Sequence, residues 1–443
     1  ALGHSIGSLQ TVNAFTYSLA TVKQIYQTEA ETTLDGSTYT TTTEFQTDVS
    51  ANDYAFGAPK RVTQTSSTAS GLSRVADYEY THYRTPWILG LPKKTTRNGK
   101  IFDEHSYNSS TGLRLTSKQF GVTMATNQYY SDGTLRSTTD AIGRITERSN
   151  YKRGTPQTTV AAKGTFAQAT TTLVVDNNGW VTSHTDPRGN VSAIGYDGMG
   201  RMTSFTPPGS NYASTTVSYS NLGSGLVQTR TRGNFRKTTP YDGYYRPILV
   251  KAEDLTGHSA PRYSKTNYDN MGRTTFTSFP SHAASPTAGT NITYDTLGRV
   301  TQTAETVGPF ATTTTDYLSG NRIRVTDPVG AQTTRTYRAF GSPGTDEAMV
   351  VVDATGTTTT MSRDIYGNIT NLNQSSGLNG YTVSVDRKFW YDSRLRLCRH
   401  RAPEFGDELF AYDNADQLTM SSRGEAAGTS CSTPSSARRT AFS

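Results

Sequence analysis

Short runs in which polar and apolar side chains alternate follow one another along most of the 443-residue chain. Arg322–Thr326 (RIRVT) and Thr333–Tyr337 (TTRTY) are examples, with successive side chains suited to opposite faces of a pleated sheet. Threonine and tyrosine are abundant, and both fit a sheet that keeps one face in water. Apolar residues do not recur at helical spacing over any long stretch. The pattern therefore predicts an all-β chain.

Turn signals separate these runs at regular intervals. Aspartate is followed three residues later by glycine at ten positions, where composition alone would give roughly two. An aspartate that opens a turn can accept backbone N–H bonds, and a glycine at the fourth position can adopt the positive φ that closes a bulged hairpin. Neighbouring signals lie 10 or 11 residues apart, as from Asp176 to Asp186 and on to Asp197. We therefore predict antiparallel hairpins whose strands are about 20 Å long.

A longer motif, Tyr-Asp-x-x-Gly-Arg, surrounds three of these turns. Its tyrosine ends the incoming strand with a large amphipathic ring. Its arginine begins the outgoing strand, where the aliphatic stem can cover a ring and the guanidinium can reach a neighbouring aspartate. Degenerate copies begin at Tyr241, Tyr391 and Tyr412. The candidate structural residues are Tyr196, Asp197, Gly200, Arg201, Tyr268, Asp269, Gly272, Arg273, Tyr294, Asp295, Gly298 and Arg299.

The turn glycines carry the sharpest expectation. Gly200, Gly272 and Gly298 should have positive φ, where a β-branched residue is strained. Gly195 lies outside the turn motif, and its replacement should cost less.

The repeats divide the sequence into three zones. Residues 1–139 form a Thr-rich β region with degenerate repeats, and residues 140–420 form the repeat region proper. Residues 421–443 are rich in Ser, Ala, Gly and Arg, which predicts a disordered or truncated tail.

These motifs resemble the YD-repeat or RHS-repeat proteins. The resemblance rests on the YDxxGR copies, on the Asp-Pro-x-Gly turns at Asp186 and Asp327, and on Trp87–Pro92 (WILGLP), and it covers roughly residues 35–420. It implies a β-sheet strip that spirals into a hollow shell, which in toxin members encloses a C-terminal toxic domain. The motif residues would then shape hairpins and stack successive rungs. No self-cleavage segment or toxin domain follows Tyr412, so this chain is expected to lack autoproteolysis and toxicity.

Composition excludes several other classes of protein. The net charge is +7, but Lys and Arg are scattered and many arginines occupy the turn position, so we expect no specific nucleic-acid partner. Two cysteines are too few for a disulfide framework, and Cys398 with His400 lacks a second ligand pair for a metal. No apolar stretch is long enough to span a membrane. The chain starts without Met or a signal peptide pattern, as a fragment or processed product would.

Some short groups of residues resemble catalytic or metal-binding motifs but lack the surrounding sequence that such motifs need. Gly3–Gly7 matches the Gly-x-Ser-x-Gly nucleophile elbow at Ser5, yet Thr-rich strand follows where the elbow needs a helix. Glu404, Asp407 and Glu408 are expected to form a solvated acidic loop. One aspartate per turn is also too few for a calcium site. No catalytic, cofactor-binding or metal-binding residue is predicted.

Two functions from different classes remain, with a third at low weight. The leading hypothesis is a non-enzymatic shell segment of a secreted or surface RHS-type toxin or Tc-like assembly, whose partners are a C-terminal toxin or cargo and further repeats of a longer parent. The alternative is a cell-surface module that binds carbohydrate or protein, which an exposed groove lined by tyrosines and Trp390 would favour. The third is a serine hydrolase that uses Ser5.

Overall fold

The computed structural model describes residues 10–17, 25–46, 57–222, 225–308, 311–378, 381–426, 428–432 and 439–441. These residues form 35 strands and one short 3-10 helix of three residues, η1 (Ser67–Ala69). The all-β expectation is confirmed. None of the described residues forms a helix long and apolar enough to cross a membrane.

The strands follow one another at short intervals. The first half comprises β1 (Gln10–Tyr17), β2 (Ile25–Leu34), β3 (Ser37–Phe45), β4 (Pro59–Ser66), β5 (Arg74–Tyr83), β6 (Ile88–Arg97), β7 (Lys100–Tyr107), β8 (Arg114–Gln119), β9 (Val122–Tyr129), β10 (Leu135–Asp140), β11 (Ile145–Lys152), β12 (Thr155–Ala161), β13 (Ala169–Val175), β14 (Val181–Thr185), β15 (Val191–Tyr196), β16 (Met202–Thr206), β17 (Thr215–Leu222) and β18 (Gly225–Arg232). The second half comprises β19 (Phe235–Pro240), β20 (Leu249–Asp254), β21 (Arg262–Tyr268), β22 (Thr274–Ser278), β23 (Gly289–Tyr294), β24 (Val300–Glu305), β25 (Thr312–Leu318), β26 (Arg322–Thr326), β27 (Gln332–Arg338), β28 (Glu347–Val352), β29 (Thr358–Arg363), β30 (Ile369–Leu378), β31 (Tyr381–Tyr391), β32 (Leu397–Ala402), β33 (Gly406–Tyr412), β34 (Leu418–Glu425) and β35 (Arg439–Ala441).

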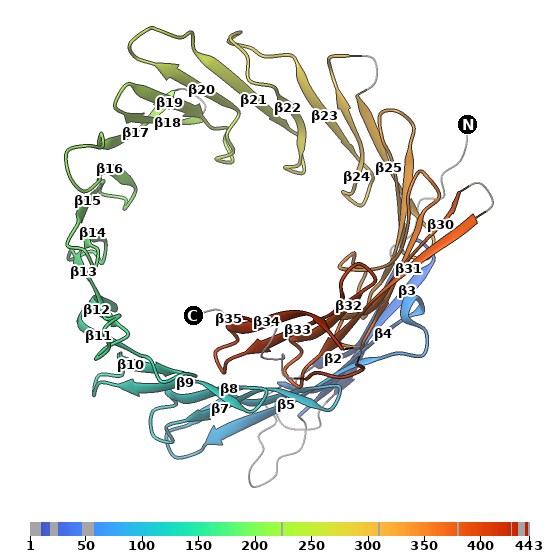
Figure 1. Ribbon diagram of the computed structural model, residues 1–443. Coiled ribbons are helices and arrows are strands. Elements are labelled where there is room, and N and C mark those ends of the chain that lie inside the picture. The colour runs from blue at the N-terminus through green and yellow to red at the C-terminus, as the bar shows by residue number, and fades with distance from the viewer. Residues whose placement is uncertain are drawn as a thin grey trace.

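Each strand pairs antiparallel with the strand before it and the strand after it, so the described chain is one continuous meander. The meander bends into a ring, with its strands forming the wall (Figure 1). The sheet overlaps itself after one circuit (Figure 1), because β3 and β4 contact the segment that follows β27: Thr41 Oγ1 donates to the Gly341 carbonyl, and Ser66 Oγ donates to the Ala339 carbonyl. The strip therefore spirals, and the last strands, β33 to β35, lie inside the outline of the ring in this view.

Burial is sparse because most of the wall is a single layer of sheet. Few large side chains are almost fully buried, among them Tyr39 and Val175, each 1% exposed. A cluster of buried residues lies where the spiral overlaps, at Ala69, Ala339 and Phe340. Most strand residues are half-buried, which is why threonine and tyrosine serve better here than leucine.

The sheet continues through both zone boundaries of the sequence. Residues 139 and 140 lie within β10, and residues 420 and 421 lie within β34. Beyond β34 the two cysteines form a disulfide, Cys398–Cys431, with 5.4 Å between their Cα atoms. The tail predicted from residue 421 therefore begins as strand, and a covalent bond ties its residue 431 to β32.

Candidate functional site

The repeat turns share one hydrogen-bond geometry. At Asp197 the Oδ1 atom accepts the backbone N–H of Met199 at 2.9 Å and of Arg201 at 3.0 Å. The Oδ2 atom accepts a hydrogen bond from Nε of Arg201 at 2.7 Å. The N–H of Gly200 donates to the Asp197 carbonyl at 3.0 Å. All ten Asp-x-x-Gly sequences close with this glycine-to-aspartate backbone bond. A single aspartate thus satisfies most of the polar groups of its turn, which explains why the motif repeats.

In several repeat turns the arginine connects the turn to a later hairpin on the same edge of the sheet. The guanidinium of Arg273 pairs with its own Asp269 and also lies 4.5 Å above the ring of Tyr294. Arg246 covers Tyr268 in the same way, also at 4.5 Å. The sequence predicted that the arginine covers a ring and reaches a neighbouring aspartate. In the structure the arginine covers a ring, and the aspartate that it pairs with is chiefly the one in its own turn.

The tyrosine hydroxyl makes the second link of the same ladder. The hydroxyl of Tyr294 donates at 2.7 Å to the carbonyl of Thr274, the residue that follows Arg273 in the sequence. Tyr268 donates to Pro247, directly after Arg246, and Tyr412 donates to Leu397, directly after Arg396. These three motifs therefore each bond to the strand that starts at an earlier motif, by a cation–π contact and a hydrogen bond.

Three residues outside the motif also belong to this ladder. Arg201 lies 4.2 Å above Tyr219, and Arg299 lies 3.9 Å above Tyr317. Trp180 occupies the arginine position of the Asp176 turn and packs on Tyr196 at 5.5 Å between ring centroids. Motif matching missed Tyr219 and Tyr317 because no Asp-x-x-Gly sequence follows either tyrosine. Only their position about one repeat after the arginine could have indicated them.

The turn glycines fill two requirements at once. Gly200, Gly272 and Gly298 have φ between +79° and +83°, as the motif predicts. A Cβ on Gly272 would also lie 3.2 Å from Nη1 of Arg246, so the arginine of the previous motif closes over it. At Gly195 the φ is not positive, and a Cβ there would lie 2.3 Å from Oγ of Ser204 on the paired strand, so a larger residue would require this hydroxyl to rotate away.

The degenerate copies keep the turn without the glycine. Tyr245, Leu395 and Asp416 occupy the glycine position, with φ of 60°, 64° and 63°. Their N–H groups still donate to the aspartate carbonyl of the turn. An L-residue in this left-handed region is strained, so the surrounding ladder holds these three turns in place.

The same bonds shift the titration of the turn aspartates. Burial acts to raise the pKa of Asp295, but backbone and guanidinium hydrogen bonds from Arg299 offset this effect and lower the pKa overall. Hydrogen bonds from Arg246 lower the pKa of Asp242. The pKa is lowered at ten turn positions, namely Asp140, Asp176, Asp186, Asp197, Asp242, Asp254, Asp269, Asp295, Asp353 and Asp392.

A second structural site is the seam, which we define as the contact of residues 35–124 with residues 299–394 where the spiral overlaps itself. Arg299 extends its guanidinium to Asp35 at 2.5 Å, and Gly320 N–H donates to the Asp35 carbonyl at 3.2 Å. Further along, Ser66 Oγ donates to the Ala339 carbonyl at 2.6 Å. Backbone and short polar side chains thus fit the two circuits closely together.

An ion cluster marks the middle of the seam. The carboxylate of Glu347 pairs with Arg74 from the other circuit and with Arg338 at 2.8 Å. Arg74 also donates to the Ile365 carbonyl at 2.9 Å and lies 4.3 Å above the ring of Phe340. The side chains of Arg338 and Glu347 are 4% and 11% exposed, so this is a nearly dry ion pair with a shared acceptor.

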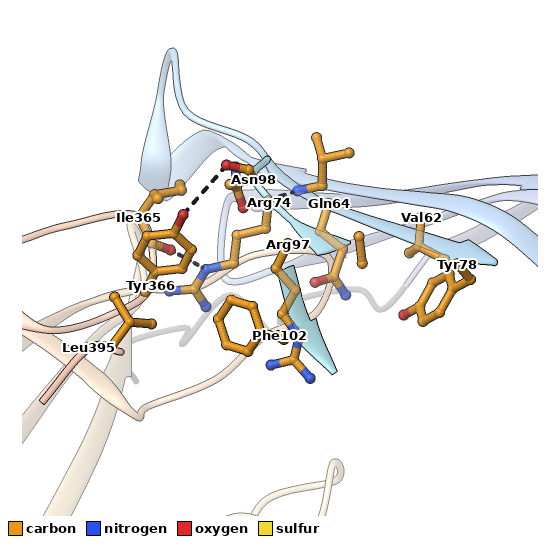
Figure 2. Close-up of a pocket in the computed structure, with 12 residues that line it drawn as sticks. Val62, Gln64, Arg74, Tyr78, Arg97, Asn98, Phe102, Ile365, Tyr366 and Leu395 are labelled. Atoms are coloured by element: carbon orange, nitrogen blue, oxygen red, sulfur yellow. Dashed lines mark hydrogen bonds between the residues drawn. The ribbon is translucent and has the colours of Figure 1, made fainter. Parts of the chain in front are cut away.

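A pocket of about 350 Å³ lies beside this cluster (Figure 2). Tyr366 closes one side, with its hydroxyl 3.4 Å from the Asn98 carbonyl and its ring 5.8 Å from Phe102. Its lining contains no carboxylate, imidazole, thiol or serine hydroxyl. Within the described ranges no group of His, Cys, Asp and Glu could hold a metal ion. Ser5 and its Gly-x-Ser-x-Gly sequence lie outside the described residues.

Of the acidic group near the C-terminal end, only Glu404 lies in a solvated turn, with its side chain 52% exposed. Asp407 and Glu408 belong to β33, and Asp407 is only 1% exposed. Arg399 and Arg401 of the paired strand β32 both bind its carboxylate, the latter at 2.6 Å. The expectation was wrong for Asp407 and Glu408, because the strand pairing brings these arginines close to Asp407, which spacing along the chain does not show.

Comparison with known proteins agrees with this geometry. The family pattern described as RHS Repeat matches residues 175–210, which include the Asp176, Asp186 and Asp197 turns. Residues 175–210 thus carry an RHS repeat. No curated protein sequence matches the chain.

One solved structure shows a similar fold at low sequence identity. The crystal structure of TcdB2-TccC3-TEV is similar with a TM-score of 0.50 and 13% identity over 94% of this chain and 22% of that chain. TcdB2-TccC3 without its hypervariable C-terminal region gives 0.48 and 13% over 94% and 26%. A Tc holotoxin pore from Photorhabdus luminescens gives 0.35 and 10% over 94% and 26%. The chain thus spans about a quarter or less of the length of these proteins.

Proposed function

We propose that this RHS-repeat chain is a structural shell segment of a secreted RHS-type toxin or Tc-like assembly. It would enclose or present a C-terminal toxin or cargo carried by a longer parent protein, whose further repeats would complete the shell. The observation that carries the proposal is the single continuous sheet that bends into a ring and locks onto itself at the seam (Figure 1). A wall of this kind separates an inner space from the surroundings without needing a catalytic group.

The arrangement of the site residues supports a structural role. Every motif residue that we describe is used in holding a turn or in stacking one motif on the previous one. The arginines, which could otherwise bind anionic ligands, are paired within their own turns. We therefore propose that the chain acts as a scaffold and that it carries out no reaction itself.

The alternative surface-binding function has less support. It predicts an open groove in which Trp390 offers a ring face to a sugar. Trp390 is only half-buried, but Arg401 lies 5.4 Å from its ring centroid and occupies that face. The encapsulating function is the better fit to these contacts.

A protease-protection assay tests the proposal. A disordered peptide with trypsin sites is fused after Ser443 in one protein and before Ala1 in another. We expect slower cleavage of the C-terminal peptide, because β33 to β35 lie inside the outline of the ring. Equal cleavage rates for the two peptides would contradict enclosure. We expect neither the unaltered chain nor its Ser5→Ala variant to show esterase or protease activity. Activity of the unaltered chain that is lost in the variant would restore the hydrolase hypothesis.

A further inference from the structure

The two edges of the sheet can be assigned from the strand order alone. Each strand reverses direction, so successive hairpin tips alternate between the edges of the strip. We call the edge with tips after odd-numbered strands rim A and the edge with tips after even-numbered strands rim B. The turns at Asp197, Asp269 and Asp364 belong to rim A, whereas the tips at Gly99 and Gly121 belong to rim B.

The seam is a contact between rim A and rim B. Tyr366, the third residue of a rim A turn, packs on Phe102 beside the rim B tip at Gly99. Lys100 at that tip donates to the Ser393 carbonyl of the next rim A turn at 2.8 Å. Arg394, again the third residue of its turn, is 8% exposed and lies 3.5 Å from Sδ of Met124. The third turn residue of rim A is therefore the one that enters rim B.

At three other rim A turns the same position is uncovered and apolar. Met199, Tyr244 and Met271 are each the third residue of a rim A turn, and they are 78%, 82% and 80% exposed. Rim B in turn exposes apolar tips beyond the seam, at Phe166, Tyr212 and Val329. The rim A residues follow β15, β19 and β21, and the rim B residues follow β12, β16 and β26, so both rims offer spaced apolar side chains to a partner.

We propose that the uncovered part of rim A, marked by Met199, Tyr244 and Met271, docks on the uncovered part of rim B of a second copy of this chain. The contact continues the seam: the same turn position enters the same kind of tip, but between two molecules. The surfaces differ, so the interface is heterologous, and copies can add at both rims. This inference does not depend on whether the ring encloses a cargo, and it applies to the chain without the further repeats of the proposed parent protein, which would cover the same rims.

Sedimentation velocity of the intact chain over a range of concentrations tests the docking. The unaltered chain, which is the parent of the variants below, is expected to form larger species as its concentration rises. A rim A variant (Met199→Glu, Tyr244→Glu, Met271→Glu) and a rim B variant (Phe166→Glu, Tyr212→Glu, Val329→Glu) are each expected to stay monomeric. An equimolar mixture of the two should form dimers and nothing larger, because only one intact rim A meets one intact rim B.

A matched control keeps the rim A positions apolar: Met199→Leu, Tyr244→Phe and Met271→Leu should associate as the parent does. Circular dichroism and hydrogen exchange at the seam must match the parent in every variant, so that misfolding is recognised. The proposal is overturned if the parent stays monomeric at all concentrations, if either glutamate variant still associates, or if their mixture remains monomeric.

Discussion

The repeat ladder and the seam stabilise the same sheet over very different distances along the chain. Ladder contacts join residues that are close in sequence, such as Tyr294 and Thr274, which are 20 positions apart. Seam contacts join residues 273 or 291 positions apart, as Ser66 with Ala339 and Arg74 with Ile365. Ladder contacts repeat one motif, whereas each seam contact uses different residues. The curvature of the wall is thus built locally, and its closure depends on a few specific pairs.

This difference predicts how damage spreads. A ladder defect should open only the neighbouring hairpins, because each hairpin contacts mainly its neighbours. A seam defect should weaken two segments that lie far apart in sequence, because each covers the other. The four predictions below test this contrast, beginning with the largest expected effect.

Glu347→Ala should be the most damaging of these changes. It leaves Arg338 nearly buried without its carboxylate and also frees Arg74, and loss of one partner of a buried ion pair typically costs about 3–5 kcal/mol. Urea unfolding would measure the loss, and hydrogen exchange should rise together around residues 65–75 and 338–366. The control is Glu79→Ala, whose half-exposed pairs with two lysines should contribute about 1 kcal/mol or less. Exchange that rises on one circuit only would count against the seam as a joint unit.

Gly272→Val should cost about 1–3 kcal/mol, because it forces a β-branched residue to positive φ and displaces Arg246. Hydrogen exchange should increase across residues 260–300 and change little elsewhere. Gly198→Val is the control, since Gly198 has no positive φ and open space around it. Loss of protection throughout residues 140–420, or no change at all, would rule out a ladder of locally stacked hairpins.

Tyr245→Gly should stabilise the protein. Removing the strain of an L-residue with positive φ stabilises the folded state by roughly 1–2 kcal/mol. The greater conformational entropy of glycine in the unfolded chain offsets about 0.5–1 kcal/mol of this gain. The net gain is expected to be about 0.5–1 kcal/mol by urea unfolding. Tyr244→Gly, one residue earlier and without positive φ, should give no gain. Equal effects of the two changes would show that backbone strain is not the cause.

Acid should weaken the ladder by small increments. The folded-state pKa of the turn aspartates is lowered, so their stabilisation is complete above the unfolded pKa and disappears as pH falls through the lower folded pKa. The free energy of unfolding should therefore be insensitive to these groups near neutral pH and should fall below about pH 4. Asp295→Asn should reduce this acid dependence, as measured by urea unfolding at several pH values. A steeper dependence in the variant would contradict the assignment.

Much of the fold could be read from the sequence because its cause is local. Asp197 satisfies its turn with atoms at most four residues away, and Gly200 needs positive φ whatever surrounds it. Alternating threonine-rich runs between such turns allow little except an antiparallel meander. The motif also indicated the ring contact of the arginine, since the ring recurs at nearly the same distance.

Other features were decided only by the tertiary structure. The sequence does not show that Glu347 meets Arg74, that β32 places two arginines against Asp407, or that Gly195 lies against Ser204. Each of these contacts depends on strand register or on the accumulated bend of many hairpins. A small change in twist per strand moves the end of a circuit by many ångströms, so the partners at the seam are set by the summed geometry of the whole wall. Local chemistry determined the hairpins of this protein, and the curvature of the complete sheet determined which of them meet.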